Sequence, residues 1–343
     1  MNKGNTLPFI SVIIPIYNEE GFIRKNLESL KNQDYPGDRY EIIAVDGGST
    51  DSSMAIVREM AQAGRIRIFD NPRRIAASAI NIGIKNARGE IITRVDAHSY
   101  VEQDYLSSIA RVFQETGEKV VGGPVRMITD TPFRKAVSHV LNSRLGVGAV
   151  PYRTLRRRAY VDSIQTGSFR REVLEKVGYF DETLPPGEDF DLNTRIRKAG
   201  FKILLDPSIR FYYYPRNSIN SLSRQYFHYG RVKPIVLIKH PEGFKLKYIV
   251  PALFTASLLL SFILFFARSF FNLSVFYPLL ILWALNLFYL LVVTFFSISS
   301  IRQIGFRASS IVLVITPITH ISYGVGFIFG IFQALKKILL GTK

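Results

Sequence analysis

The sequence predicts an α/β domain followed by helices that cross a membrane. Over the first 215 residues, short runs rich in Val and Ile alternate with amphipathic stretches, which is typical of strands separated by helices in a mostly parallel sheet. From residue 249 onward, long runs carry no charge, as spanning helices do. Polar clusters follow three of the predicted strands, and ligands of such sheets bind beyond the carboxyl ends of the strands.

The pattern of apolar residues predicts each element of the α/β domain in turn. Continuous apolar runs without alternation suit strands that are buried on both faces. We expect strands at 9–16, 41–45, 65–69, 90–95 and 119–125, and helices near 19–33, 52–63, 76–87 and 102–115. The clusters PIYNEE, DGGSTD and DAHS follow the first, second and fourth strands, so they should meet at one edge of the sheet.

The first two clusters offer groups that could hold a nucleotide. Tyr17 follows Pro15 at the end of the first strand and could stack on a base, and Glu19 could cap the next helix or bond a ribose. Asp46 could accept a hydrogen bond from a uracil N–H or a ribose hydroxyl, and the glycines after it let a ligand approach the backbone. A plain strand-to-helix turn is the alternative for PIYNEE. After the third strand, Arg74 and its neighbour Arg73 could meet phosphates or acidic lipid, or could remain solvated.

The run RVDAH places a carboxylate at the end of the fourth strand. Asp96 could bind Mg²⁺ through one oxygen if substrate phosphates and water supply the other ligands. His98 is a further possible ligand, better suited to Mn²⁺ than to Mg²⁺. A turn cap for Asp96 and a hydrogen-bonding role for His98 are the alternatives.

A later helix begins with several acidic residues. Acidic residues in a first turn are ordinary dipole and cap chemistry, which accounts for Glu188. That chemistry does not require both Asp189 and Asp191, and a carboxylate there could take a proton from an attacking hydroxyl. The small residues around Gly167 suit the lining of a narrow pocket.

The overall composition narrows the classes of partner and metal site. The 343 residues suit about two domains, and the lack of cysteine excludes disulfides and thiolate metal sites. The formal net charge is +17, yet residues 1–124 are nearly neutral and residues 251–343 hold six basic and no acidic residues. Because the positive charge adjoins apolar segments, we expect it to meet membrane lipid and no nucleic acid.

Residues 216–248 form a basic, aromatic stretch that includes Arg231. Such a stretch before a span is typical of an interfacial segment, and it could contact anionic headgroups or the diphosphate of a lipid carrier. Simple anchoring is the alternative. The N-terminal residues have no signal-peptide core, so we expect the α/β domain on the cytoplasmic side of the cell (inner) membrane.

Three apolar segments follow, at 249–267, 273–298 and 308–335. The third contains a proline and three glycines, so a re-entrant or interfacial helix is the alternative to a third span. Basic loops stay inside, and Arg302 with Arg307 agrees with a cytoplasmic α/β domain. A third span would place the lysines at 336, 337 and 343 outside, so either that segment does not cross or the charge bias is overridden.

In this order, PIYNEE, DGGSTD, RVDAHS and GEDFDLNTRIRKAGFKI resemble the motifs of family 2 glycosyltransferases with the GT-A fold. The resemblance covers about residues 8–235, and the sequence of these motifs and of the segments between them is similar to the membrane-bound branch typified by succinoglycan-biosynthesis glucosyltransferases. We therefore expect a GT-A domain at 1–215, a juxtamembrane segment at 216–248 and a membrane domain at 249–343. The resemblance implies inverting transfer from a nucleotide-sugar, usually UDP-linked, with a divalent cation.

The resemblance also assigns roles to residues. Asp96 stands at the last Asp of the family's D-x-D motif, which touches the metal and the diphosphate, and Asp189 stands at the usual catalytic base. Our candidates are Asp189 as base; Pro15, Tyr17, Glu19, Asp46 and Asp96 for the nucleotide-sugar; Gly167, Glu188 and Arg231 for the acceptor or pocket; and Asp96 with His98 for Mg²⁺ or Mn²⁺.

Two positions depart from the family pattern. Arg94 replaces the first Asp of D-x-D, and whether it faces the site depends on how regular the strand stays. The run QYFHY at 225–229 differs from the Q-x-x-R-W of processive synthases, so we do not expect polymerisation.

We expect transfer from a UDP-sugar to a polyprenyl-diphosphate-linked saccharide in exopolysaccharide or surface glycan synthesis. One alternative is transfer directly to polyprenyl phosphate, where the nucleophile is already an anion and a base matters little. Another is a nucleotide-sugar-sensing domain on a membrane anchor.

Overall fold

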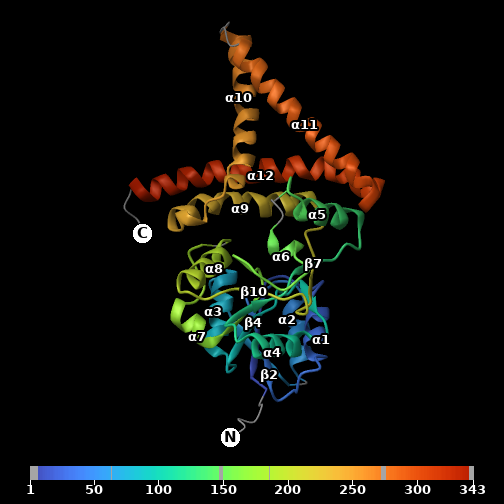
Figure 1. Cartoon of the computed structure of the whole chain (residues 1–343), viewed down its shortest axis with the longest axis vertical. Helices are drawn as coiled ribbons and strands as arrows, with labels where there is room; N and C mark the ends of the chain where they lie inside the picture. The colour runs from blue at the N-terminus through green and yellow to red at the C-terminus, as the bar shows by residue number, and fades with distance from the viewer. Residues whose placement is uncertain (1–6, 63, 147–149, 185, 272–275, 340–343) are drawn as a thin grey trace. The chain divides into compact units, whose positions relative to one another are not determined.

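The computed structural model describes residues 7–339 except 63, 147–149, 185 and 272–275 (Figure 1). It divides into two compact units. The first comprises Met1–Met127 and Pro151–Tyr214, and the second comprises Ile128–Val150 and Pro215–Lys343. The sequence predicts a boundary near residue 215 but contains no sign that 128–150 groups with the apolar helices.

An eight-stranded sheet in the order β3-β2-β1-β4-β9-β6-β10-β8 forms the centre of the first unit. Neighbouring strands from β3 to β4 are parallel, whereas β9 runs antiparallel to both β4 and β6. The predicted α/β fold with a mostly parallel sheet is confirmed, and the antiparallel β9 is an addition to it. The strands are β1 Ile10–Ile16, β2 Tyr40–Asp46, β3 Ile66–Asp70, β4 Ile91–Arg94, β6 Val120–Gly122, β8 Ala159–Tyr160, β9 Gly167–Arg170 and β10 Leu204–Leu205.

Helices cover both faces of this sheet, which explains the continuous apolar runs of its strands. Val12 and Ile14 of β1 belong to one apolar core, and Ile13 between them belongs to another, because successive side chains of a strand point to opposite faces. The first core includes residues of α1 (Ile23–Lys31), α2 (Ser53–Ala61) and α4 (Tyr105–Thr116). The second includes residues of α3 (Ala76–Asn86), α7 (Arg171–Val177) and α8 (Glu188–Lys198).

A small sheet in the order β5-β11-β7 supports the turn after β4. Its strands are β5 Ser99–Val101, β11 Phe211–Tyr213 and β7 Val125–Met127, and the short helix α6 spans Pro151–Thr154. Ser99 N–H donates to Asp96 O at 3.0 Å and Tyr214 N–H donates to His98 O at 3.1 Å. The backbone from Asp96 to His98 is therefore held on both sides.

The second unit is helical. It contains α5 Pro132–Asn142, α9 Ile219–Lys239, the short turns Pro241–Gly243 and Leu246–Tyr248, and the long helices α10 Val250–Phe271, α11 Phe276–Ile304 and α12 Phe306–Leu339. Three apolar stretches, 246–270, 276–304 and 306–336, are long enough to cross a membrane by length and composition. These helices indicate membrane association.

Candidate active site

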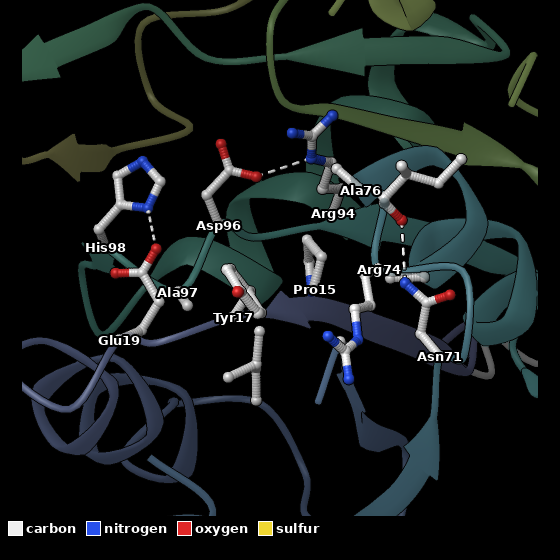
Figure 2. A pocket seen from close by; sticks show the side chains of 14 residues that line it. Pro15, Tyr17, Glu19, Asn71, Arg74, Ala76, Arg94, Asp96, Ala97 and His98 are labelled. Carbon is white, nitrogen blue, oxygen red and sulfur yellow. Dashed lines mark hydrogen bonds and ion pairs between the residues drawn. The ribbon is translucent and has the colours of Figure 1, made fainter. Parts of the chain in front are cut away.

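Three parallel strands end together at the edge of the sheet where the site lies. In the register of the sheet, Ile16 pairs with Asp46 and Asp46 pairs with Asp70, while Arg94 at the end of β4 pairs with Ile13. The cavity at this edge is shown in Figure 2. It is lined by Pro15, Ile16, Tyr17, Glu19, Gly47, Asn71, Arg74, Ile75, Ala76, Ala79, Arg94, Asp96, Ala97 and His98.

The loops after β1 and β2 are fastened to each other. Asn18 has a left-handed backbone (φ 54°), and its side-chain oxygen accepts a hydrogen bond from Thr50 N–H at 2.8 Å. Glu19 N–H donates to Ser53 Oγ at 2.7 Å. These bonds hold Tyr17, which is 52% exposed, at the cavity with its ring accessible to a ligand.

The carboxylate of Asp46 organises the turn that follows it. It accepts hydrogen bonds from Gly48 N–H at 3.2 Å, Ser49 N–H at 3.1 Å and Ser49 Oγ at 2.6 Å. The neighbouring Gly47 lines the cavity. The nucleotide contact of Asp46 stays a prediction, and the turn already occupies much of the accepting capacity of its oxygens.

Arg94 joins the two carboxylates on which the predicted chemistry depends. Its Nε donates to Asp96 Oδ1 at 2.7 Å and one terminal nitrogen donates to Asp189 Oδ1 at 2.9 Å. Its side chain is only 11% exposed. Arg94 therefore faces the site, and its guanidinium lies between Asp96 and Asp189.

These contacts separate the pKa values of the two carboxyl groups. Burial raises the pKa of Asp189 to about 7, and the charges of Glu188 and Asp96 act in the same direction, although Arg94 opposes them. Burial would also raise the pKa of Asp96, but Arg94 and His98 lower it below its usual value overall. Asp96 is therefore ionised, and Asp189 has a pKa close to neutrality, as suits a general base.

His98 is turned toward Glu19. Its Nδ1 lies 2.9 Å from Glu19 Oε1, and its ring packs edge-on against Tyr213. Among the residues that the structure describes, no group of three or more His, Asp or Glu side chains is arranged to hold a metal ion. Asp96 does keep one oxygen that points away from Arg94 (Figure 2). A single carboxylate fits a Mg²⁺ or Mn²⁺ that arrives with a diphosphate, since such ions take phosphate and water as their other ligands.

The sequence pattern did not indicate Asn71 as a site residue, and it left open whether Arg74 meets a ligand or is solvated. Asn71 is 3% exposed, donates from Nδ2 to Ile75 O at 2.9 Å, and has no hydrogen-bond partner for Oδ1 among the described residues. Arg74 has a left-handed backbone (φ 57°), which costs a non-glycine residue roughly 1 kcal/mol and is often found at ligand sites. Because β3 is parallel to β2 and ends beside it, Asn71 and Arg74, which follow β3, belong to the same edge as the three polar clusters.

The acceptor candidates lie in different places. Glu188 opens α8 and accepts a hydrogen bond from Gly187 N–H at 2.7 Å. Gly167 lies in β9, where a Cβ atom would be crowded by Ile164 and Phe169, so close packing explains this glycine. Arg231 lies in α9 of the second unit. Glu188 precedes Asp189 in α8, and Gly167 adjoins Ser168, which pairs with Thr93 next to Arg94, whereas Arg231 belongs to the other unit.

Comparisons with known proteins identify the family of this chain. The profile described as Glycosyl transferase family 2 matches residues 11–178. The chain is 32% identical over 240 residues to a dolichyl N-acetyl-alpha-D-glucosaminyl phosphate 3-beta-D-2,3-diacetamido-2,3-dideoxy-beta-D-glucuronosyltransferase of Methanococcus voltae, covering 67% of this chain and 74% of the relative. It is 31% identical over 243 residues to the succinoglycan biosynthesis protein ExoA of Rhizobium meliloti, covering 70% of this chain and 73% of the relative.

Solved structures share the fold. The mannosyltransferase PcManGT of Pyrobaculum calidifontis, in complex with GDP-Man and Mn²⁺, matches with a TM-score of 0.52 and 19% identity over 99% of this chain and 89% of that chain. GalNAc-T7 with UDP, GalNAc and Mn²⁺ matches with a TM-score of 0.50 and 18% identity over 66% of this chain and 48% of that chain. These structures show that the first unit has the GT-A fold. The chain belongs to glycosyltransferase family 2.

Proposed function

We propose that this enzyme transfers a sugar, with inversion, from a UDP-sugar to a hydroxyl of a saccharide that a polyprenyl diphosphate carries in the membrane. The Asp96–Arg94–Asp189 cluster carries the proposal, because it joins a carboxylate with a pKa of about 7 to the edge of the sheet where we expect the donor phosphates to bind. Relatives that act on a dolichyl-phosphate-linked sugar or in succinoglycan synthesis support a role in glycan or polysaccharide synthesis.

The donor would lie across the strand ends. Tyr17 offers a stacking surface for the base, with Pro15, Glu19 and Asp46 around the nucleoside. Asn71 Oδ1 is a buried acceptor of the kind that the N–H of uracil would satisfy. Arg74 and Arg94 line the same cavity and suit the diphosphate, since guanidinium groups bind phosphate through two hydrogen bonds.

Asp96, with His98 as a second candidate, would hold Mg²⁺ or Mn²⁺ together with the donor phosphates. Such an ion stabilises negative charge on a leaving diphosphate. Arg94 contributes a fixed positive charge at the same place and holds Asp189 by a hydrogen bond of 2.9 Å.

Asp189 would remove the proton of the acceptor hydroxyl. The hydroxyl oxygen attacks the anomeric carbon from the face opposite to UDP, so one displacement inverts the configuration. Glu188 and Gly167 remain candidates for the acceptor side of the pocket, and Arg231 with the basic stretch 216–248 for the lipid carrier. We place the enzyme in the cell membrane as a multi-pass protein with its catalytic unit on the cytoplasmic side.

The test is a panel of nucleotide-sugars with membrane lipid extract, followed by mass analysis of the glycolipid. Asp189→Asn should lower turnover by about 10²–10⁴-fold while UDP binding, measured by calorimetry, persists. Glu172→Gln is the control and should turn over as the parent does, since it removes an exposed carboxylate of α7 that is paired with Lys119. Turnover retained by Asp189→Asn, with an alkali-stable and acid-labile product, would instead indicate transfer to polyprenyl phosphate.

A further inference from the structure

Helix α12 is attached to other elements of the second unit along its length. Near its start, Ser309 O accepts a hydrogen bond from Ser297 Oγ at 2.6 Å and Ser309 Oγ accepts one from Ser300 at 2.7 Å, both at the C-terminal end of α11. In its middle, His320 Nε2 donates to Gly146 O at 3.2 Å, in the turn that follows α5. Toward its end it packs against α9.

The contact with α9 is a close approach of two backbones. A Cβ atom at Gly326 would collide with the backbone of Phe227, and one at Gly330 would collide with the backbone of Arg231. Helix α9 carries four basic residues and no acidic ones, and the chain runs from its last residue, Lys239, to the first residue of α10 in eleven steps. A charged helix in that place belongs at the water-facing boundary of a membrane, on the side where α10 begins.

The contacts at its two ends argue against a membrane crossing by α12. Ser309 and Gly330 are 21 residues apart on one helix, which is about 32 Å at 1.5 Å per residue, close to the thickness of the hydrocarbon core. Because α10 and α11 form a hairpin, the end of α11 returns to the side where α10 begins. Ser309 is attached to the end of α11 and Gly330 to α9, so both ends of this stretch lie on the same side.

Contacts between α12 and the α10–α11 hairpin agree with this placement of its two ends. Gly324 lies against Pro251 and Thr255 in the first turns of α10. His320 also contacts Tyr289 of α11 at 2.8 Å, and the Tyr289 ring stacks on Phe254, again near the start of α10. The far part of α10 contacts α11 instead, through Phe265–Trp283 and Arg268–Phe276. Figure 1 shows α12 running across the base of α10 beside α9.

The surface of α12 has two distinct faces. The exposed residues Val314, Ile321, Val325 and Phe332 follow one another at spacings of 7, 4 and 7, so they form a single apolar stripe along the helix. The buried residues Ser309, Thr316, His320, Phe327 and Ala334 lie on the opposite side. By contrast, the spans in α10 and α11 are largely exposed to their surroundings all round, as lipid-embedded helices are.

We propose that α12 is not a third span but lies in the plane of the membrane, with its apolar stripe in the boundary between headgroups and acyl chains. The occupant of that stripe is lipid, continuous with the lipid around the α10–α11 hairpin. The chain then crosses the membrane twice, and Lys336 stays on the side of α9, as the distribution of basic residues requires. The proposal rests on the membrane association in the proposed function and not on the transfer reaction.

Sidedness tests the proposal directly, because the chain has no cysteine and any introduced cysteine is a unique label. Four exposed residues serve, each changed to cysteine in the full chain: Asn217, Ser269, Gln303 and Lys336. A membrane-impermeant maleimide is applied to sealed vesicles before and after permeabilisation. We expect Asn217→Cys, Gln303→Cys and Lys336→Cys to be labelled from one side and Ser269→Cys from the other. Labelling of positions 336 and 269 from the same side would overturn the proposal.

Depth provides a second measurement. Nitroxide labels at 314, 321, 325 and 332 should all report one shallow depth. Labels at Leu253 and Leu260 of α10 are the matched control, and their depths should differ by about 10 Å, since a spanning helix rises 1.5 Å per residue. A depth that changes steadily from 314 to 332 would reject an in-plane helix. Turnover of each variant is assayed separately, so failure of the topology and failure of the proposed reaction give different results.

Discussion

Arg94 is a position where this site departs from the family pattern, and it contacts the proposed base. Its charge lowers the pKa of Asp189, which burial raises to about 7. A base acts only when it is deprotonated, so kcat/KM should fall about tenfold for each pH unit below about 7. Arg94→Ala removes the lowering effect, and the acid limb of the pH–rate profile should move to higher pH.

Two variants make this measurement specific. Arg94→Lys keeps a positive charge and should restore part of the shift. Arg74→Ala removes the other arginine of the cavity, on the loop after β3, so it should weaken UDP binding and leave the limb in place. An unchanged limb in Arg94→Ala would contradict the role of Arg94 as the group that sets the protonation of Asp189.

Asp96 leads to a prediction about metal removal. One carboxylate and the donor phosphates would share the ion, whereas Arg74 and Arg94 are present without it. EDTA should therefore abolish turnover but weaken UDP binding, measured by calorimetry, by less than about tenfold, because guanidinium–phosphate bonds remain. If EDTA leaves turnover unchanged, the metal role of Asp96 fails and Arg74 with Arg94 would bind the diphosphate without an ion.

At the scale of elements, the sequence predicts the strands that are buried on both faces of the sheet, because such strands must be apolar throughout. The runs around Val12 and Ile42 are continuous because helices cover both sides of the sheet, and their strands are confirmed. β9 has only four residues, Gly167–Arg170, and its place between β4 and β6 comes from pairing with distant strands, which no local pattern records. Asn71 escaped for a related reason: its importance comes from the adjacency of β3 and β2.

Close packing of α9 and α12 gives a prediction at the same scale. Gly330→Leu places a side chain where the backbone of Arg231 lies, so the helices must separate. Overpacking of this kind costs about 1–3 kcal/mol, and the second unit should lose thermal stability in detergent, measured by size exclusion after heating. Phe332→Leu, at a residue that is 65% exposed, is the matched control and should behave as the parent. Equal stability of the two variants would contradict the close approach.

At the scale of the whole molecule, the grouping of Ile128–Val150 with the apolar helices could not be predicted from sequence. Helix α5 has the polar composition of an ordinary amphipathic helix, and its attachment to α12 depends on contacts such as that of Gly146 with His320, 174 positions apart. The sequence marks residue 249 clearly, because the apolar helices that follow it differ in composition from the residues before it. The segment Ile128–Val150 has the composition of the first unit, and only its contacts group it with the apolar helices.

The net positive charge is concentrated in the second unit, which holds 16 of the 44 basic residues but only two of the 27 acidic ones. Ten of those basic residues lie in the stretches 128–150 and 215–250, outside the long apolar helices. Each basic residue near an anionic surface contributes about 1 kcal/mol, and the attraction decays within a Debye length. Because the apolar helices already account for membrane association, this attraction should act on how the enzyme meets the proposed lipid-linked acceptor. We expect a lower KM for the acceptor in nanodiscs of phosphatidylglycerol than of phosphatidylcholine, with the difference reduced by salt and kcat little changed.

The variant Arg231→Gln should reduce this difference in KM between the two lipids. Arg24→Gln is the control, because Arg24 lies in the first unit and its side chain is 47% exposed, and it should leave the difference unchanged. Equal KM values in the two lipids at low salt would show that the basic residues have another role.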